Sequence, residues 1–129
     1  MKNTEQAKTF ESLRDIHPHM LVEGIMARAV EGERLTMAVV ELDPNAVSPN
    51  HHHENEQLGF VIAGSITMRI GNDERELMPG DTYNIPTHVS HDAVAGADGA
   101  TVVDVFVPVR EDWKKLERAD PKKPRWPAI

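Results

Sequence analysis

The amino-acid sequence predicts an all-β sandwich or barrel, and three observations lead to this fold class. Short apolar runs recur at roughly regular intervals along the 129 residues. Turn-forming glycine, proline, asparagine and aspartate residues bound these runs, which are short for helices. Within residues 66–70, apolar and polar side chains alternate, as they do in a strand with one buried face.

The first predicted elements are an N-terminal segment and a hairpin. We expect residues 3–16 to form a short, weakly amphipathic helix or a loose arm that ends before Pro18. Residues 21–30 and 35–42 follow as two strands, which the polar segment 31–34 connects as a hairpin. Turn signals after this hairpin then lead the chain to three consecutive histidines.

The most regular predicted hairpin lies in the middle of the chain. Residues 66–70 pair with residues 74–78 across the turn Gly71-Asn72-Asp73. Three further short strands complete the predicted set, at residues 82–85, 91–95 and 101–107.

The C-terminal region changes character after Pro108. Residues 111–118 are expected to form about two helical turns with Trp113 and Leu116 directed inward. Three prolines exclude regular structure from the tail, in which Trp126 packs either on its own chain or on a second subunit. We therefore expect one domain with an N-terminal arm, a barrel and a C-terminal extension, at residues 1–20, 21–113 and 114–129.

Composition excludes several functional classes. The formal net charge of -7 and the isoelectric point of about 5.4 leave no basic surface for nucleic acid. The chain has no cysteine, which excludes disulfides and thiolate metal sites and fits a reducing compartment. No secretory signal and no stretch long enough to cross a bilayer is present, so we expect a cytoplasmic protein without a membrane partner.

The three consecutive histidines concentrate metal-ligand chemistry. In an extended backbone His51 and His53 share one face, and His52 points to the other. Gln57 can bring an amide oxygen to the same point from the next strand, and His91 can approach after a later turn. Such a set of imidazole and amide ligands predicts one divalent transition metal, among zinc, nickel, manganese, iron and copper(II).

A plainer interpretation is that the three histidines form a solvated loop and that His91 is a surface residue. The polar residues near the cluster are not expected to be ligands. We expect outward-facing or rim positions for His52, Glu54, Glu56 and His88. His17 and His19, which flank Pro18, are expected on the surface.

These segments resemble the two sequence motifs of the cupin superfamily, over a region from about Leu21 to Trp113. The ligand-bearing positions and the glycine of the first motif fall on His51, His53, Gln57 and Gly64. The glycine, proline and histidine of the second motif fall on Gly80, Pro86 and His91. Gln57 replaces the more common glutamate, so the ligand set carries no charge, whereas His88 and Ala95 replace the usual glycine and asparagine.

A second informative stretch lies near the end of the last strand. Alternation places Asp104, Phe106 and, beyond a proline, Arg110 on one face, with valines on the other. One interpretation of a carboxylate among valines is a buried structural pair between Asp104 and Arg110. The stretch is also similar to the Asp-x-Phe-x-Pro-x-Arg-Glu-Asp segment of small single-domain cupins related to the pectin-degradation protein KdgF.

This resemblance implies both a fold and an activity. The implied fold is a jelly roll, the double-stranded β-helix, in a homodimer. The implied activity is metal-dependent opening of unsaturated uronate rings to 5-keto-4-deoxyuronate, a reaction on a small anionic sugar acid. Within the resemblance Asp104 is the catalytic acid–base, Phe106 shapes the pocket and Arg110 binds the substrate. The metal ligands that the resemblance implies fall on His51, His53, Gln57 and His91.

Two other functions remain open at this point. One is a cupin dioxygenase acting on a flavonol or diketone, which needs a redox-active metal and a largely apolar cavity. The other is a cupin that binds a small molecule without turnover.

Overall fold

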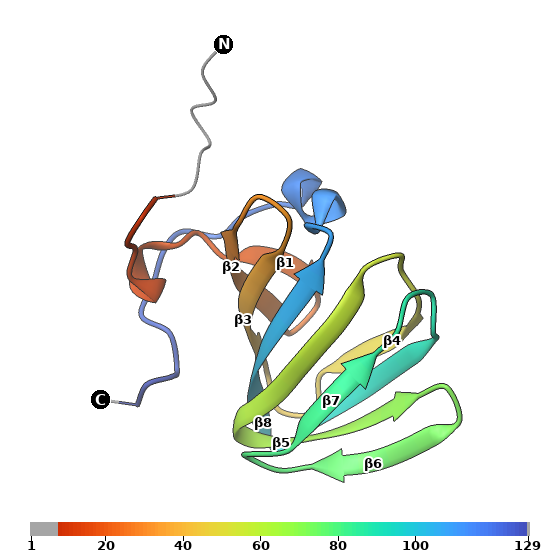
Figure 1. Cartoon of the computed structure of the whole chain (residues 1–129). Coiled ribbons are helices and arrows are strands. Elements are labelled where there is room, and N and C mark those ends of the chain that lie inside the picture. The colour runs from red at the N-terminus through yellow and green to blue at the C-terminus, as the bar shows by residue number, and fades with distance from the viewer. Residues whose placement is uncertain (1–7, 129) are drawn as a thin grey trace.

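The computed structural model describes residues 8–128, and within them almost all regular structure is strand. The strands are β1 (His19–Val22), β2 (Ile25–Glu31), β3 (Thr36–Leu42), β4 (Val47–His51), β5 (Glu56–Ile70), β6 (Asp73–Leu77), β7 (Thr82–Ile85) and β8 (His91–Val107). Two short 3-10 helices, η1 (Leu13–Asp15) and η2 (Glu111–Lys115), flank them (Figure 1). The all-β prediction is confirmed.

Two long strands, β5 and β8, pass through both layers of the fold. The sheet order is β1-β2-β3-β8-β5-β6, with β4 paired to β8 and β7 paired to β5. The first half of β5 and the second half of β8 lie beside β3 and β7, whereas the other halves lie beside β4 and β6. The two halves of the antiparallel sheet therefore face each other as a sandwich (Figure 1).

The bend between the halves of β5 requires a glycine. The register between β5 and β8 shifts on both sides of Gly64, whose φ is +75°. A β-carbon at this position would collide with the carbonyl oxygen of Gly99 on β8. Only glycine fits both the left-handed backbone and this close approach.

Several predicted elements differ from the structure. The expected strand 21–30 is two strands, because Gly24 with a φ of +81° forms a tight turn between β1 and β2. Residues 91–95 and 101–107 belong to one strand, β8, rather than two. The expected helix at 111–118 shortens to η2, and the described part of the N-terminal segment contains only η1, while residues 3–7 lie outside the described residues.

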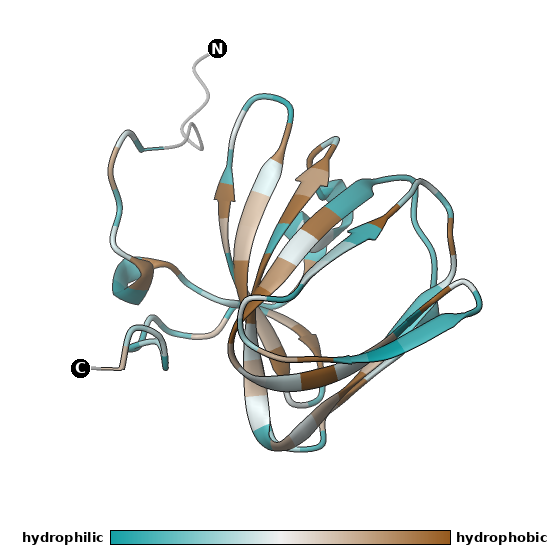
Figure 2. Cartoon of the chain, turned by 60° about the horizontal axis from the view of Figure 1, so that its bottom comes forward, coloured by the Kyte–Doolittle hydropathy of each residue, from teal (hydrophilic) through white to brown (hydrophobic). Residues whose placement is uncertain are grey.

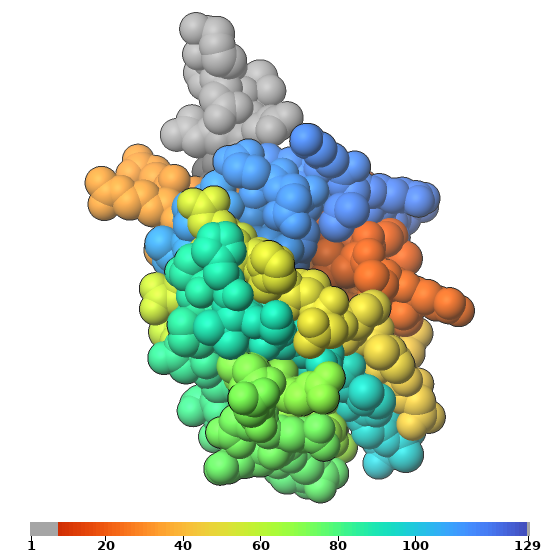
Figure 3. Space-filling view, turned by 90° about the vertical axis from the view of Figure 1, so that its right-hand side faces the viewer, coloured from red at the N-terminus to blue at the C-terminus, as the bar shows by residue number. Residues whose placement is uncertain are grey.

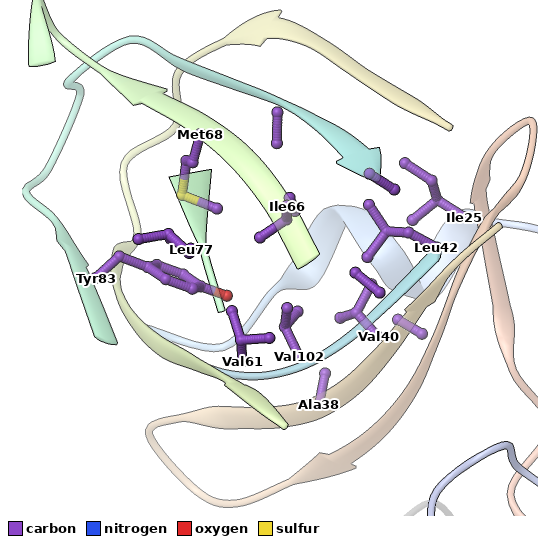
Figure 4. Close-up of a cluster of buried hydrophobic side chains, with 14 of the residues drawn as sticks. Ile25, Ala38, Val40, Leu42, Val61, Ile66, Met68, Leu77, Tyr83 and Val102 are labelled. Atoms are coloured by element: carbon purple, nitrogen blue, oxygen red, sulfur yellow. The ribbon is translucent and has the colours of Figure 1, made fainter. Parts of the chain in front are cut away.

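The hydrophobic core lies between the two halves of the sandwich. Apolar side chains from every strand except β4 point into this space, and Figure 4 shows Val61, Val102 and Tyr83 among them. Along the strands, apolar residues alternate with polar ones, as Figure 2 shows by hydropathy. Trp113 on η2 is buried and Leu116 is half-buried, so their predicted inward direction is confirmed.

The C-terminal extension is tied to its own chain. Arg28 on β2 forms a buried ion pair with Glu41 on β3, with 2.8 Å between Nη1 and Oε2. Arg28 also donates to the carbonyl of Lys122, and the backbone N–H of Arg125 donates to Glu41 at 2.8 Å. Trp126 itself is 42% exposed.

The expectation of a surface position for His19 is wrong. Its side chain is 2% exposed and lies 5.9 Å from the Trp113 ring, centroid to centroid. The backbone of His19 forms a β-bridge with Arg118, and the carbonyl of Pro18 accepts a hydrogen bond from the N–H of Ala119. The C-terminal extension therefore covers this histidine. His17 is exposed, as expected.

Candidate metal centre and adjoining pocket

Three histidines from distant parts of the sequence meet at one end of the sandwich. His51 ends β4, His91 begins β8, and the two are directly paired in the sheet register. The ring centroid of His91 lies 4.2 Å from that of His51 and 4.9 Å from that of His53. One ligand atom from each of the three lies within 4.8 Å of the others, so the cluster can hold a metal ion. Figure 3 shows the segments near residues 50 (yellow), 88 (teal) and 112 (blue) adjoining on this face.

Backbone carbonyls orient the three imidazoles. The Nδ1 atoms of His51, His53 and His91 lie 2.8, 2.9 and 2.9 Å from the carbonyl oxygens of Pro49, Asn55 and Val89, respectively. Nδ1 therefore carries the proton and donates it, which leaves each Nε2 with a free lone pair. Nε2 of His53 is buried and has no hydrogen-bond partner among the described residues. Such an oriented but unpartnered nitrogen fits a metal ligand.

The environment also favours the neutral form of two members of the cluster, His53 and His91. Burial, together with the smaller effects of His51, His53 and Arg110, lowers the pKa of His91 to about 4 against the opposing hydrogen bond to Val89. Burial, followed by the charge of Arg110, lowers the pKa of His53. Neutral imidazole is the form that binds metal, so the cluster fits a cation near neutral pH.

Gln57 and Asp104 line the interior beside the histidines. Gln57 is 7% exposed, and its amide interacts with His53 on one side and with Asp104 on the other. Asp104 is buried and accepts a hydrogen bond at Oδ1 from the hydroxyl of Tyr83, at 2.5 Å. Burial raises the pKa of Asp104 to about 6, against the opposing effects of Tyr83, Gln57 and Arg110. A carboxyl group with such a pKa can both accept and donate a proton near neutrality.

Arg110 is held between two aromatic rings. Its guanidinium carbon lies 4.7 Å from the centroid of the Phe106 ring and 4.6 Å from that of Trp113. Nε and Nη2 donate to the two carboxylate oxygens of Asp112, at 3.0 and 2.9 Å. The structural pair considered for Asp104 and Arg110 is thus replaced by a pair between Arg110 and Asp112. The predicted common face of Asp104, Phe106 and Arg110 is confirmed, since all three are buried at one cavity.

A cavity of about 410 Å³ connects these groups. Its polar lining includes His51, Gln57, Tyr83, His91, Asp104 and Arg110. Aliphatic side chains of the core, among them Val40, Ile66 and Met68, form the remaining wall. The cavity thus places a cationic group, a carboxyl group and a candidate metal centre around one small molecule.

The neighbouring polar residues lie where expected. His52, Glu54 and Glu56 are exposed, and the His52 ring lies 5.9 Å from that of His88. His88 is also exposed, and its backbone N–H donates to the carbonyl of His53. None of these four side chains lines the cavity.

The sequence interpretation missed several residues of this site. Tyr83 was only part of a predicted strand, although its spacing of two from Ile85 would have placed both side chains on one face. Asp112 and Trp113 follow Arg110 closely, but only the conformation of η2 brings them onto the guanidinium. Asn55 gives no sequence signal for its role, which is to donate to the carbonyls of Pro108 and Val109 beside Arg110.

Comparison with known proteins identifies the family. The sequence description of the cupin domain matches residues 38–107. The chain belongs to the cupin family. The pectin degradation protein KdgF of Dickeya dadantii is 30% identical over 95 residues, which are 72% of this cupin and 86% of that protein.

Solved structures agree with this assignment. KdgF from Halomonas sp. has a TM-score of 0.75 and 31% identity, covering 81% of this cupin and 97% of that chain. An RmlC-like cupin from Shewanella frigidimarina has a TM-score of 0.78 and 24% identity, covering 85% and 99% of the two chains. The predicted double-stranded β-helix and the resemblance to KdgF are confirmed. In the described part of this cupin, no helix is long and apolar enough to cross a membrane.

Proposed function

We propose that this cupin is a metal-dependent enzyme that opens the ring of unsaturated uronates to give 5-keto-4-deoxyuronate. The similarity to two KdgF proteins, one of them named for pectin degradation, supports a substrate of this class. The observation that carries the proposal is that Asp104 and Arg110 line one cavity together with His51 and His91, two members of the three-histidine cluster. Ring opening of a small sugar acid would use an anion-binding group, a proton carrier and an electrophile, and this site combines groups that can fill these three roles.

His51, His53, Gln57 and His91 would hold one divalent ion, either zinc, nickel, manganese, iron or copper. Their free Nε2 atoms and the amide oxygen of Gln57 form an uncharged ligand set. When bound, the ion would act as a Lewis acid toward a substrate oxygen, and its undiminished charge would favour an anionic substrate.

Arg110 would bind the substrate carboxylate. Asp112 engages Nε and Nη2, so the guanidinium presents the edge that carries Nη1 to a second carboxylate. Phe106 and Trp113 fix the plane of this group from both sides, and Phe106 also forms a wall of the cavity. The substrate would therefore bind with its carboxylate at Arg110 and its ring toward the histidines.

Asp104 would move the proton. Its carboxylate accepts the proton of the anomeric hydroxyl as the bond between the anomeric carbon and the ring oxygen breaks, which leaves the ring oxygen as an enolate. The same group then returns this proton to the far carbon of the enolate double bond, and the enolate becomes the ketone. The pKa of about 6 suits both directions of transfer.

Turnover with an unsaturated monouronate tests this function directly. The ultraviolet absorbance of the ring double bond should disappear faster with the wild-type protein than without it. Arg110→Ala should raise KM by about tenfold to a hundredfold while the metal content stays constant. Arg75→Ala on the exposed face of β6 is the matched control and should behave as wild type. An Arg110→Ala variant with unchanged KM would remove Arg110 from substrate binding.

A dioxygenase is the second candidate, because one wall of the cavity is aliphatic. Oxygen uptake with flavonols or diketones by the iron- or copper-loaded protein tests it. Uptake without any turnover of uronate would place this cupin among the oxygen-using enzymes.

We also propose a homodimer that forms through the outer face of β3, β8 and β5. The sheet register aligns Met37, Val105 and Leu58 across these strands, and Phe60 lies beside them. Met37, Leu58 and Phe60 are 42%, 48% and 42% exposed. A chain with a net charge of -7 repels its copies, so contact is favoured where the surface is uncharged. Light scattering should find a dimer for the wild type and a monomer for Phe60→Glu, and a monomeric wild type would contradict the proposal.

A further inference from the structure

Tyr83 occupies a buried position that the proposed chemistry has not yet used. Its side chain is 7% exposed, and its ring packs among core residues such as Leu77 and Val61 (Figure 4). The hydroxyl group points into the interior and donates to Oδ1 of Asp104 at 2.5 Å. Tyr83, which belongs to the core and also lines the cavity, therefore contacts the proposed proton carrier directly.

Three strands bring this pair together in one row. In the register, Tyr83 on β7 lies opposite Gly59 on β5, and Gly59 lies opposite Asp104 on β8. The two polar side chains thus reach toward each other across the central strand. The contact depends on the core of the sheet and not on a mobile loop.

Gly59 shows how little room the pair leaves. A β-carbon at this position would collide with Oδ1 of Asp104 and with the ring of Tyr83. The backbone of Gly59 does not have a positive φ, so the turn-forming property of glycine does not explain its presence. The space that a side chain would need is filled by Tyr83 and Asp104 instead.

We infer that Tyr83 is a positioning residue, which holds one oxygen of Asp104 so that the other oxygen faces the substrate. Gly59 provides the space for this arrangement. The inference rests on the proposed function of Asp104 in proton transfer. Because proton transfer requires the reacting atoms to be aligned, a freely rotating carboxylate would serve it poorly.

The first test removes only the hydroxyl group. Tyr83→Phe should lower kcat by about tenfold to a hundredfold and change KM by less than about threefold, since a small misplacement of a reacting group costs rate more than binding. Metal content should not change. Thr101→Val is the matched control, because it removes a buried hydroxyl on the same strand as Asp104 but outside the cavity. A folded, metal-replete Tyr83→Phe protein with wild-type kcat would overturn the inference.

A double-mutant cycle separates positioning from general stability. Asp104→Asn should abolish most of the activity, and Tyr83→Phe should add no further loss in that background, because both changes remove the same function. Fully additive losses would overturn the inference. Gly59→Ala should imitate Tyr83→Phe in kcat, since its methyl group displaces the same pair, and wild-type kcat in this variant would contradict the argument from space.

Crystal structures of the wild type and Tyr83→Phe supply a readout that needs no substrate. The inference predicts that the Asp104 carboxylate turns away from its wild-type orientation in the variant. An unmoved carboxylate would overturn it. If wild-type protein does not act on uronates, the proposed function fails, and the structures alone then decide whether Tyr83 positions Asp104.

Discussion

Arg110 forms its bidentate ion pair with Asp112, two residues further along the chain. Nε and Nη2 of Arg110 donate to Oδ1 and Oδ2 of Asp112. The Asp112 side chain is 65% exposed, so the pair contributes about 0–1 kcal/mol to the free energy of unfolding. Its main effect is to fix the direction of a guanidinium group whose plane Phe106 and Trp113 already hold.

Replacing Asp112 should therefore affect binding more than stability. Asp112→Asn should raise KM for an unsaturated uronate by about threefold to tenfold, because the guanidinium loses its bidentate partner, and change the free energy of unfolding by less than about 1 kcal/mol. Steady-state kinetics and urea denaturation measure the two effects. Glu111→Gln, an adjacent loss of charge, is the control. Unchanged KM in Asp112→Asn would show that Arg110 needs no such partner.

Breaking the buried pair of Arg28 and Glu41 should instead lower the stability of the protein and leave its metal site intact. Glu41→Ala leaves the Arg28 guanidinium buried without its carboxylate and removes the acceptor for the backbone of Arg125. We expect a loss of about 3–5 kcal/mol in the free energy of unfolding, with metal content unchanged. The double variant Arg28→Met with Glu41→Leu should recover most of this loss. If Glu41→Ala alone is as stable as the wild type, the stability does not depend on this buried ion pair, which would contradict the prediction.

His19 should make stability depend on pH. Burial, and secondarily the charge of Arg118, lower its pKa in the folded protein below the ordinary 6.5. At a pH between these two pKa values, His19 is protonated in the unfolded chain but not in the folded protein. Its contribution to folding stability is therefore fully present above about pH 6.5 and is lost as the pH falls below that value. Urea denaturation at about pH 7.5 and at about pH 5.5 measures the effect. The free energy of unfolding should fall less between these two pH values for His19→Gln than for the wild type. Equal losses would mean that His19 titrates alike in both states.

Local patterns predicted much of this cupin because they follow from short-range geometry. Alternation along one strand was enough to place Asp104 and Phe106 on the same face, and spacing placed His51 beside His53. The turn at Gly24 was missed because a single glycine in an apolar run does not reveal a positive φ. The burial of His19 was missed because its cover comes from residues near the other end of the chain.

Sequence patterns predicted two strands where the structure has the single long strand β8, because a local pattern does not show how a segment pairs with distant strands. Its glycines and aspartate between residues 95 and 100 resemble a turn in sequence, and Gly99 does have a positive φ. Pairing with β5 before and after this segment nevertheless continues the strand through it, with a shift of register. The roles of Tyr83 and Asp112 also depend on contacts between elements. Such contacts become visible only when the register and the conformation of η2 are known.

Elemental analysis of protein purified without a metal-affinity tag tests the central claim most directly. The wild type should contain close to one transition-metal ion per chain. His91→Ala should lose most of it, because the buried member of the cluster is gone. His52→Ala should retain it, since this exposed neighbour is not a member of the cluster. Little metal in the wild type, even after divalent ions are added back, or equal metal in wild type and His91→Ala, would contradict the proposed metal-dependent site.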